Sequence, residues 1–491
     1  MSARHGAPAA ARRGRAGAAR PVRQGPWLGR EFEVEVGPVA HGGHCVARHE
    51  GRVLFVRHTL PGERVLVRVT EDRGGGYCRA DAVRVLTAAP ERVPPPCPHA
   101  GPGKCGGCDW QHASGAAQRA LKAAVVREQL TRLAGLPDVR VTVEELPGGL
   151  LGSRTRVRYA VDPAGHTGLR RHRSHQLEPV AHCPLGTDEV TAAAAGERTW
   201  PDAAEVEVVA ASTGDTTILV RPREDAVPPS GGEGSVPRSG GEDAGAPSGG
   251  AAAGRPRNGA AGPAGAGAAA GRGAPPRGRQ RAGDHDGGDP RVAVGGTVVA
   301  GPERIRERAG GRDWELAAGG FWQVHPAAAD TLAACVLDLL APRPGETALD
   351  LYAGAGLFAG LLAAAVGPGG HVLAVEADER AAADARVNLA GLPAEVRAGR
   401  VTAGLLGGLG TAPDVAVLDP PRSGAGPEVL TALLALRPRA VAYVSCDPAA
   451  LARDLRAALD AGWHLAALRA FDCFPMTQHV ETVALLEPDP R

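Results

Sequence analysis

The stretch Asp350-Leu-Tyr352-Ala-Gly354-Ala-Gly356 lies between a predicted strand, 347–351, and a predicted helix, 357–366. A strand that turns through glycines into a helix points backbone N–H groups toward a bound ligand. Downstream, short apolar runs alternate with helical patterns, and these runs span 371–375, 415–418 and 440–444. The alternation predicts an α/β fold: a doubly wound, Rossmann-like parallel sheet that binds its ligand at the carboxyl ends of the strands.

Glu376 follows the next predicted strand after this glycine loop. An acidic residue in that position can accept hydrogen bonds from the ribose diol of a nucleotide-type cofactor. No further glycine follows at the third position of the dinucleotide fingerprint, which disfavours a nicotinamide dinucleotide. The loop and Glu376 therefore predict a site for a different nucleotide-type cofactor.

The chain has 491 residues and a formal net charge of +1, and arginine supplies nearly all of its positive charge. Its length predicts two or three domains. Arginine suits the recognition of phosphates and base planes, although a composition this rich in Ala, Gly, Arg and Pro also fits genomic base bias. Nine cysteines without a secretory signal indicate a cytoplasmic chain whose thiols bind metal or do chemistry. We expect a monomer, and no membrane span because apolar runs of about eighteen residues do not occur.

Residues 28–88 alternate apolar and polar side chains in short runs, such as 31–36 and 64–69, which turn residues separate. Several short strands in so small a segment predict a small β-barrel of the oligonucleotide-binding type. Contact with RNA and a purely structural role both remain open for this barrel.

Two segments lack the apolar residues that a packed core needs. Residues 1–27 are rich in arginine, and we expect a disordered basic arm there. Residues 224–289 are a run of Gly, Pro, Ser, Ala and Arg with almost no large apolar residue. We expect a disordered insertion at this point of the central domain.

The predicted central α+β domain, residues 89–313, contains a group of cysteines. Cys97, Cys105 and Cys108 lie on a glycine-rich loop, and Cys183 follows far downstream. Glycine and proline let the backbone wrap closely around a compact inorganic centre. Four thiolates suit either zinc or a 4Fe–4S cluster, and the spacing alone does not decide between them.

Three polar motifs near the C-terminus each follow an apolar run: Asp419-Pro-Pro-Arg422, Ser445-Cys446-Asp447-Pro448 and His479-Val-Glu481. They supply a carboxylate beside two prolines, a thiol at a strand end and a second carboxylate. Cys446 fits a nucleophile and Glu481 fits its acid/base partner. The simpler interpretations are a buried structural cysteine and a surface acid.

The order and spacing of these motifs resemble the RNA 5-methyluridine methyltransferases. In addition, Gly37-Pro-Val-Ala-His-Gly-Gly43 and Leu60-Pro-Gly-Glu63 resemble the TRAM domain that is attached to many RNA-modifying enzymes. The resemblance covers nearly the whole chain except the central insertion. It implies that residues 314–491 form an S-adenosylmethionine-dependent methyltransferase domain that methylates carbon 5 of a uridine in RNA.

The same resemblance implies roles for individual residues. Cys446 would attack carbon 6 of the uracil, and Glu481 would remove the proton from carbon 5. The residues that would bind S-adenosylmethionine are Gln323, Tyr352, Glu376 and Asp419. The ligands of a 4Fe–4S cluster, with zinc as the alternative metal, would be Cys97, Cys105, Cys108 and Cys183. The gap between the first two cysteines is longer than in the family pattern, and a loop insertion accounts for the difference.

The resemblance favours 23S ribosomal RNA as the substrate, because the bacterial transfer RNA enzymes of the family usually lack both the barrel and the cluster. Transfer RNA is the alternative substrate. A non-enzymatic alternative is an RNA-binding chaperone that retains the fold, and the intact pair of Cys446 and Glu481 counts against it. Amino-group methyltransferases carry an aromatic residue where this chain has Arg422, so we disfavour that chemistry. The sequence does not name the uridine.

Overall fold

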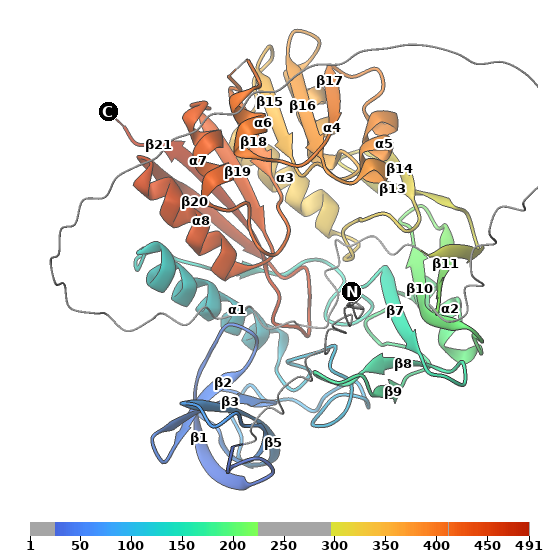
Figure 1. Cartoon of the computed structure of the whole chain (residues 1–491), viewed down its shortest axis with the longest axis vertical. Helices are drawn as coiled ribbons and strands as arrows, with labels where there is room; N and C mark the ends of the chain where they lie inside the picture. The colour runs from blue at the N-terminus through green and yellow to red at the C-terminus, as the bar shows by residue number, and fades with distance from the viewer. Residues whose placement is uncertain (1–24, 224–295, 411, 491) are drawn as a thin grey trace, which may run out of the picture. The chain divides into compact units, whose positions relative to one another are not determined.

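The protein is described from a computed structural model that covers residues 25–223, 296–410 and 412–490 (Figure 1). The predicted insertion and the predicted basic arm up to residue 24 lie outside the described residues. Within the described ranges, no helix is both long enough and apolar enough to cross a lipid bilayer.

The N-terminal strands form the closed barrel that their alternation predicts. In hydrogen-bonded order they are β1 (Glu31–Val39), β2 (Cys45–His49), β3 (Arg52–Arg57), β5 (Tyr77–Thr87) and β4 (Arg64–Glu71). Every second side chain of β1 points inward, so Phe32, Val34 and Val36 are buried between exposed glutamates. Closure of the barrel removes the unpaired edges that an open sheet of this length would expose.

The apolar core of the barrel continues into the segment that follows it. Trp110 is fully buried in the same cluster, and its indole N–H donates to the carbonyl of Gly43 at 3.1 Å. The helix α1 (Gly115–Gln129) adds Leu121 and Val125 to this cluster before a π-helical turn, Leu130–Ala134, ends it. The barrel therefore shares its core with the rest of the chain.

A second, six-stranded antiparallel sheet follows. Its order is β12 (Thr297–Ala300), β11 (Thr216–Pro222), β10 (Ala203–Ala210), β7 (Arg156–Val161), β8 (Thr167–Arg170) and β9 (Leu177–Pro179). The helix α2 (Asp188–Ala192) and the 3-10 turn Ala195–Glu197 contribute Val190 and Ala195 to its core. Because β12 comes after residues 224–295, strands from both sides of that segment complete one sheet.

The C-terminal part is an eight-stranded mixed sheet. Its order is β17 (Ala394–Ala398), β16 (His371–Glu376), β15 (Thr347–Leu351), β18 (Val415–Leu418), β19 (Ala440–Ser445), β21 (Glu481–Pro488), β20 (Trp463–Phe471) and β6 (Val143–Glu144). The strands from β17 to β19 are parallel, whereas β21 runs antiparallel to both β19 and β20.

Helices cover both faces of this sheet (Figure 1). They are α3 (Ala328–Leu340), α4 (Leu357–Val366), α5 (Glu379–Asn388), α6 (Ala403–Gly407), α7 (Pro427–Ala435) and α8 (Pro448–Asp460). Successive residues of β15 enter different cores: Leu349 packs in the cluster with α7 and α8, and Ala348 in the cluster with α3 and α4. The doubly wound α/β prediction is confirmed, because the sheet buries apolar side chains on both faces.

Two elements between the sheets complete the packing. The hairpin of β13 (Arg304–Ala309) and β14 (Arg312–Ala317) buries Trp314 in one cluster with Leu361 of α4. The strand β6 pairs with β20, and α1 contributes Val126 to the core of the C-terminal sheet. Residues within the predicted central domain thus extend the C-terminal sheet, while the domain boundaries remain a prediction.

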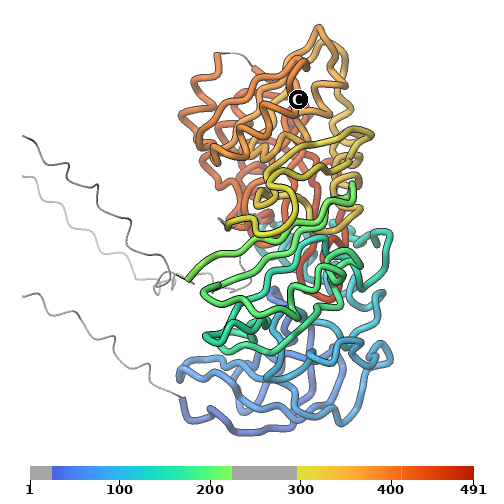
Figure 2. Tube along the Cα trace, turned by 90° about the vertical axis from the view of Figure 1, so that its right-hand side faces the viewer, coloured from blue at the N-terminus to red at the C-terminus, as the bar shows by residue number. Residues whose placement is uncertain are grey.

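The segment between β20 and β21 leaves the sheet and lies beside the chain from Asp109 to Lys122, as the red trace shows in Figures 1 and 2. The backbone N–H of Asp109 donates to the carbonyl of Met476 at 2.9 Å, and the N–H of Met476 donates to Gln118 Oε1 at 2.7 Å. Lys122 is buried in an ion pair with Asp472. Because a buried charge is costly without its partner, this pair holds the segment in one place.

Candidate active site

The parallel strands place several polar residues at one edge of the C-terminal sheet. Asp350 lies in β15, Glu376 ends β16, Asp419 directly follows β18 and Cys446 directly follows β19. Because these neighbouring strands run in the same direction, their carboxyl ends meet at a common edge. This is the edge at which the sequence predicted a nucleotide-type cofactor.

The glycine loop folds back against the end of β16. Tyr352 has a φ of +66°, an unusual value for a residue with a Cβ, and its N–H donates to the carbonyl of Val375 at 2.9 Å. Gly354 donates its N–H to Glu376 Oε2 at 2.8 Å. A Cβ on Gly354 would meet no atom within 4 Å, so this part of the loop faces open space. Strain at Tyr352 is typical of a loop shaped for a ligand.

Negative charge is concentrated beside this loop. Asp350 is fully buried, and its Oδ2 accepts from the N–H of Ala359 in α4 at 2.7 Å. Burial, together with the nearby carboxylates of Asp419 and Glu376, raises the pKa of Asp350 to about 8. An edge with three carboxyl groups favours a cationic ligand, because a positive charge relieves their mutual repulsion.

Asp350→Asn is expected to raise the stability of the ligand-free protein at pH 8, and the gain is expected to vanish toward pH 4. The folded pKa of about 8 exceeds the unfolded value of about 3.9, so the wild-type protein loses stability as pH rises through this window, and asparagine, which does not ionise, avoids that loss. Asparagine keeps an acceptor for Ala359. Melting temperatures of both proteins between these pH values check this result. A difference that does not change with pH would mean that Asp350 does not titrate there.

A pocket beside this edge brings three predicted site residues together. Its lining consists of Phe321, Gln323, Val324, Arg422, Cys446, Phe474, His479 and Glu481. Cys446 is 7% exposed and Glu481 is 2% exposed, so both side chains are shielded from solvent. Tyr352, Glu376 and Asp419 lie outside this lining, at the neighbouring strand ends.

The antiparallel strand β21 explains why Cys446 and Glu481 share the pocket. Ser445 of β19 pairs with Thr482 of β21, and Thr482 Oγ1 donates to the carbonyl of Ser445 at 2.9 Å. Continuing this register by one residue places Cys446 opposite Glu481. Two residues that are far apart in sequence are therefore juxtaposed by the sheet itself.

Arg422 and His479 form a second polar pair in the pocket. Arg422 Nη2 lies 3.1 Å from His479 Nε2, and Gln478 Nε2 lies 3.2 Å from His479 Nδ1. The ring of Phe474 packs edge-on against the imidazole, with centroids 6.0 Å apart. No role was predicted from the sequence for Phe321, Phe474 or His479, and the signal for His479 was its position in one motif with Glu481.

The loop that carries Arg422 is held by a buried polar network. The hydroxyl of Tyr443 donates to Asp454 Oδ2 at 2.6 Å and accepts from the N–H of Ala425 at 2.9 Å. The N–H of Gly426 also donates to Asp454 Oδ2, at 3.1 Å. These bonds fix the Pro-Pro-Arg turn relative to β19 and α8.

Gln323 reaches the pocket from the segment that joins β14 to α3. The carbonyl of Val324 accepts from both the N–H and the hydroxyl of Thr155, at 2.8 and 3.0 Å. This anchor ties the segment to the six-stranded sheet. The structure therefore brings Gln323 to Cys446 and Glu481, as an active site built from several segments requires.

The barrel also contacts the loop that follows β19. Asp447, the residue after Cys446, caps α8 by accepting from the N–H of Ala450 at 2.8 Å, and its other oxygen lies 3.1 Å from Nε2 of His41 in the barrel. Gln478, the residue before His479, donates its N–H to Asp109 Oδ2 at 3.0 Å. The two sides of the pocket are thus held by residues from the N-terminal third of the chain.

The four predicted cluster ligands lie near one another. Burial, with a smaller contribution from Cys183, raises the pKa of Cys105 to about 11 and that of Cys108 to about 12. Burial likewise raises the pKa of Cys97, and Cys183 again adds to it. All nine cysteines are among the described residues, and none forms a disulfide. Among the described residues, however, no group of three or more His, Cys, Asp or Glu side chains has a geometry that could hold a metal ion.

Comparison with known proteins identifies both ends of the chain. Residues 28–83 match the model of the TRAM domain, and residues 412–489 match that of the tRNA (uracil-5-)-methyltransferase family. An RNA methyltransferase of Streptomyces avermitilis is 47% identical over 475 residues, which cover 94% of this chain and 99% of the relative. The 23S rRNA (uracil(1939)-C(5))-methyltransferase of Shewanella sp. is 31% identical over 470 residues, 91% of this chain and 93% of that protein.

A solved structure shares the fold. The tRNA (uracil-54, C5)-methyltransferase of Pyrococcus abyssi, in complex with S-adenosyl-L-homocysteine, superimposes with a TM-score of 0.62 and 21% identity. The match covers 93% of this chain and all of that one. Fold and site together define an S-adenosylmethionine-dependent RNA methyltransferase. More narrowly, the chain belongs to the RNA uracil-5-methyltransferase family, with an N-terminal TRAM domain.

Proposed function

We propose that this enzyme methylates carbon 5 of a uridine in 23S ribosomal RNA through a covalent adduct between Cys446 and carbon 6. The observation that carries the proposal is the shielded pocket in which the β19–β21 register sets Cys446 opposite Glu481. Similarity over nearly full length to a 23S ribosomal RNA enzyme supports the choice of RNA. The TRAM barrel supports an RNA substrate in general.

The reaction first needs a nucleophile that adds to the uracil, and then a base that removes a proton from it. Carbon 5 of uracil is a poor nucleophile until a thiolate adds to carbon 6 and generates an enolate. In the proposed mechanism, the sulfur of Cys446 forms this bond, and carbon 5 then accepts the methyl group. Glu481 removes the proton from carbon 5, and elimination breaks the bond from sulfur to carbon 6. S-Adenosylmethionine supplies the methyl group as an electrophilic sulfonium.

The remaining polar residues position the reactants. We propose that Tyr352, Glu376 and Asp419 hold S-adenosylmethionine at the strand edge, and that Gln323 completes that site from the pocket side. The three carboxyl groups of the edge suit a ligand that carries a positive sulfonium. Arg422 and His479 line the pocket as a polar pair and are suited to hold the uracil or its neighbouring phosphate.

The choice of RNA is tested with the purified enzyme and RNA from a strain that lacks the gene. Incubation with S-adenosylmethionine is expected to restore 5-methyluridine in 23S ribosomal RNA, detected by mass spectrometry of nuclease digests. Restoration in transfer RNA instead would replace the proposed substrate by its alternative. RNA binding without any methylation would favour a chaperone.

We further propose that Cys97, Cys105, Cys108 and Cys183 hold a 4Fe–4S cluster. The electrostatic influence of Cys183 on each of the other three thiols supports this proposal. Hydrogen bonds to sulfur support thiolate at two of them: Gly107 N–H donates to Cys105 at 3.4 Å, and Gln111 Nε2 donates to Cys108 at 3.3 Å. Cysteine ligands lose their protons when a metal binds. Because the unfolded chain rarely holds such ligands together, metal binding and local folding are coupled.

Anaerobically purified protein is expected to be brown and to contain about four irons per chain. Cys105→Ser is expected to lose the colour and to weaken folding or RNA binding more than binding of S-adenosylmethionine. Cys335→Ala, which removes a buried thiol in the C-terminal core, is the matched control and is expected to stay brown. Stoichiometric zinc without visible absorbance would overturn the choice of an iron–sulfur cluster.

A further inference from the structure

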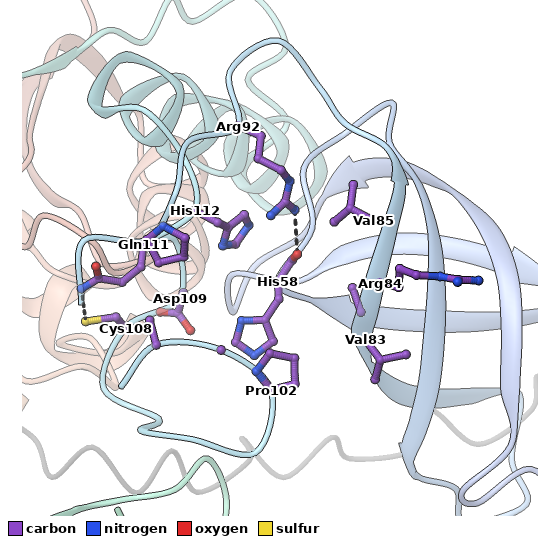
Figure 3. Close-up of a pocket in the computed structure, with 14 residues that line it drawn as sticks. His58, Val83, Arg84, Val85, Arg92, Pro102, Cys108, Asp109, Gln111 and His112 are labelled. Carbon is purple, nitrogen blue, oxygen red and sulfur yellow. Dashed lines mark hydrogen bonds between the residues drawn. The ribbon is translucent and has the colours of Figure 1, made fainter. Parts of the chain in front are cut away.

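A second pocket lies between the barrel and the cysteine loop, apart from the residues that line the methyl-transfer pocket (Figure 3). The barrel contributes Val83 and Val85 of β5, and the loop contributes Pro102 and Gln111. His58, from the turn after β3, lies between these two sides in Figure 3. None of these residues has a part in the proposed methyl transfer.

Most of the wall of this pocket is apolar or uncharged, and the carboxylate of Asp109 in the lining lies 3.6 Å from Arg57 Nη2. Val83 is 36% exposed, a large fraction for a valine at a concave surface. Burial, together with nearby arginines, lowers the pKa of His58 to about 2 and that of His112 to about 4, so both imidazoles are neutral at physiological pH. Arg92 donates to the buried carboxylate of Glu63 at 2.7 Å and is thereby neutralised.

The pocket therefore offers no cation to a phosphate. Arg84 also belongs to the lining, but its guanidinium points away from the loop residues in Figure 3. The pairing of β5 with β4 shifts register between Ala82 and Arg84, so simple alternation of side chains does not hold at this point of the strand. A phosphate would lose its hydration here without gaining a charged partner.

Two buried polar atoms in the pocket lack a hydrogen-bond partner among the described residues. Gln111 is 3% exposed; its Nε2 donates to Cys108, and its Oε1 is left without a donor. His58 Nε2 is likewise unpartnered. A buried polar atom without a hydrogen-bond partner destabilises a protein. A ligand with polar edges could supply the missing hydrogen bond to each of these two atoms.

We propose that this pocket holds an unpaired nucleobase of the RNA substrate, at a site separate from the uridine that is methylated. A base has flat apolar faces that suit valine, proline and neutral imidazole, and an edge with N–H groups that can donate to Gln111 Oε1. The pocket stands on a small barrel of the kind that binds single-stranded nucleic acid. The proposal rests on RNA being the substrate of this enzyme.

The pocket is linked to the active site by a short path. Asp109 lies in its lining, and the same carboxylate accepts the N–H of Gln478, whose side chain contacts His479. A base held here would therefore fix the RNA relative to the loop that carries His479 and Glu481.

The proposal is tested with His58→Asn and Val83→Ser, and with Val299→Ser, at an exposed valine of β12 outside the lining, as the matched control. Asparagine is chosen because His58 has a φ of +62°, which asparagine tolerates. The double variant His58→Asn/Val83→Ser is expected to bind substrate RNA roughly five- to fiftyfold more weakly, as the loss of one stacked base implies. The slope of log affinity against log salt is expected to stay unchanged, because no phosphate contact is lost.

Ultraviolet crosslinking of wild-type enzyme to RNA adds a direct readout. A crosslink from the pocket residues to a nucleotide other than the methylated uridine supports the proposal. RNA affinity of the double variant within about twofold of wild type, at unchanged melting temperature, would overturn it. A salt slope lowered by about one would overturn it as well, since the occupant would then be a phosphate. Wild-type enzyme that methylates RNA in the same preparation separates failure of this proposal from failure of the proposed function.

Discussion

Cys446→Ala is expected to lower the rate of methyl transfer by roughly a thousandfold or more, because carbon 5 has no nucleophilic character until a thiolate adds to carbon 6. Binding of S-adenosylmethionine is expected to remain near wild type, since Cys446 lies in the pocket proposed for the uracil and is not one of the carboxyl groups of the strand edge. Single-turnover methylation of RNA and equilibrium binding of S-adenosylmethionine measure the two effects separately.

The matched control is Cys473→Ala. Cys473 is a second buried thiol near the same carboxylate: burial raises its pKa well above the usual range, and Glu481 raises it further. Its removal is expected to leave turnover within about tenfold of wild type, because its raised pKa makes it a poor nucleophile. If Cys446→Ala kept turnover within about tenfold while Cys473→Ala abolished it, the nucleophile would be Cys473.

Glu481→Gln is expected to separate the two halves of the reaction. The amide cannot take the proton from carbon 5, so methyl transfer proceeds and the elimination stalls. The enzyme is then expected to accumulate as a protein–RNA adduct that survives a denaturing gel, with turnover reduced roughly a hundredfold or more. Normal turnover without any adduct would remove Glu481 from the mechanism.

The α/β elements that could be predicted well are those whose side chains are buried on both faces. The strands at 347–351 and 415–418 match β15 and β18 because a fully buried strand is a short, uninterrupted apolar run. β17 was missed because its residues are only partly buried at the sheet edge and read Ala-Glu-Val-Arg-Ala. α6 was missed because it is a single turn bounded by glycines.

Contacts between distant segments could not be predicted. The pairing of β6 with β20 joins residues more than three hundred positions apart, and two residues give no strand pattern of their own. The bonds from His41 to Asp447 and from Asp109 to Gln478 are equally long-range polar contacts. No local rule connects such residues, because only the folded chain brings them together.

The sequence predicts proximity only for those candidate site residues that stand at the carboxyl ends of parallel strands. Glu376, Asp419 and Cys446 each follow a buried parallel strand, so a common edge could be expected from the pattern. Glu481 required the antiparallel register of β21, which the sequence does not reveal. The second pocket, between the barrel and the cysteine loop, depends on how two separate segments pack, and no motif indicated it.

Because the barrel shares its apolar core with the segment that follows it, deletion of the barrel would not test RNA binding alone. Trp110, Leu121 and Val125 belong to the barrel cluster, so deletion of the first strands would expose them and damage the catalytic part as well. Point substitutions at the barrel surface, such as Val83→Ser, isolate RNA contacts from this loss of apolar burial.

The covalent mechanism at Cys446 is tested most directly with RNA in which the target uridine carries fluorine at carbon 5. Fluorine cannot leave as a cation, so the adduct is expected to stop after methyl transfer. Mass spectrometry of tryptic peptides is then expected to find residues 440–453 joined through Cys446 to a 5-fluoro-5-methyl nucleotide. An adduct on another cysteine, or methylation of ordinary RNA by an enzyme that this RNA never traps, would contradict the mechanism.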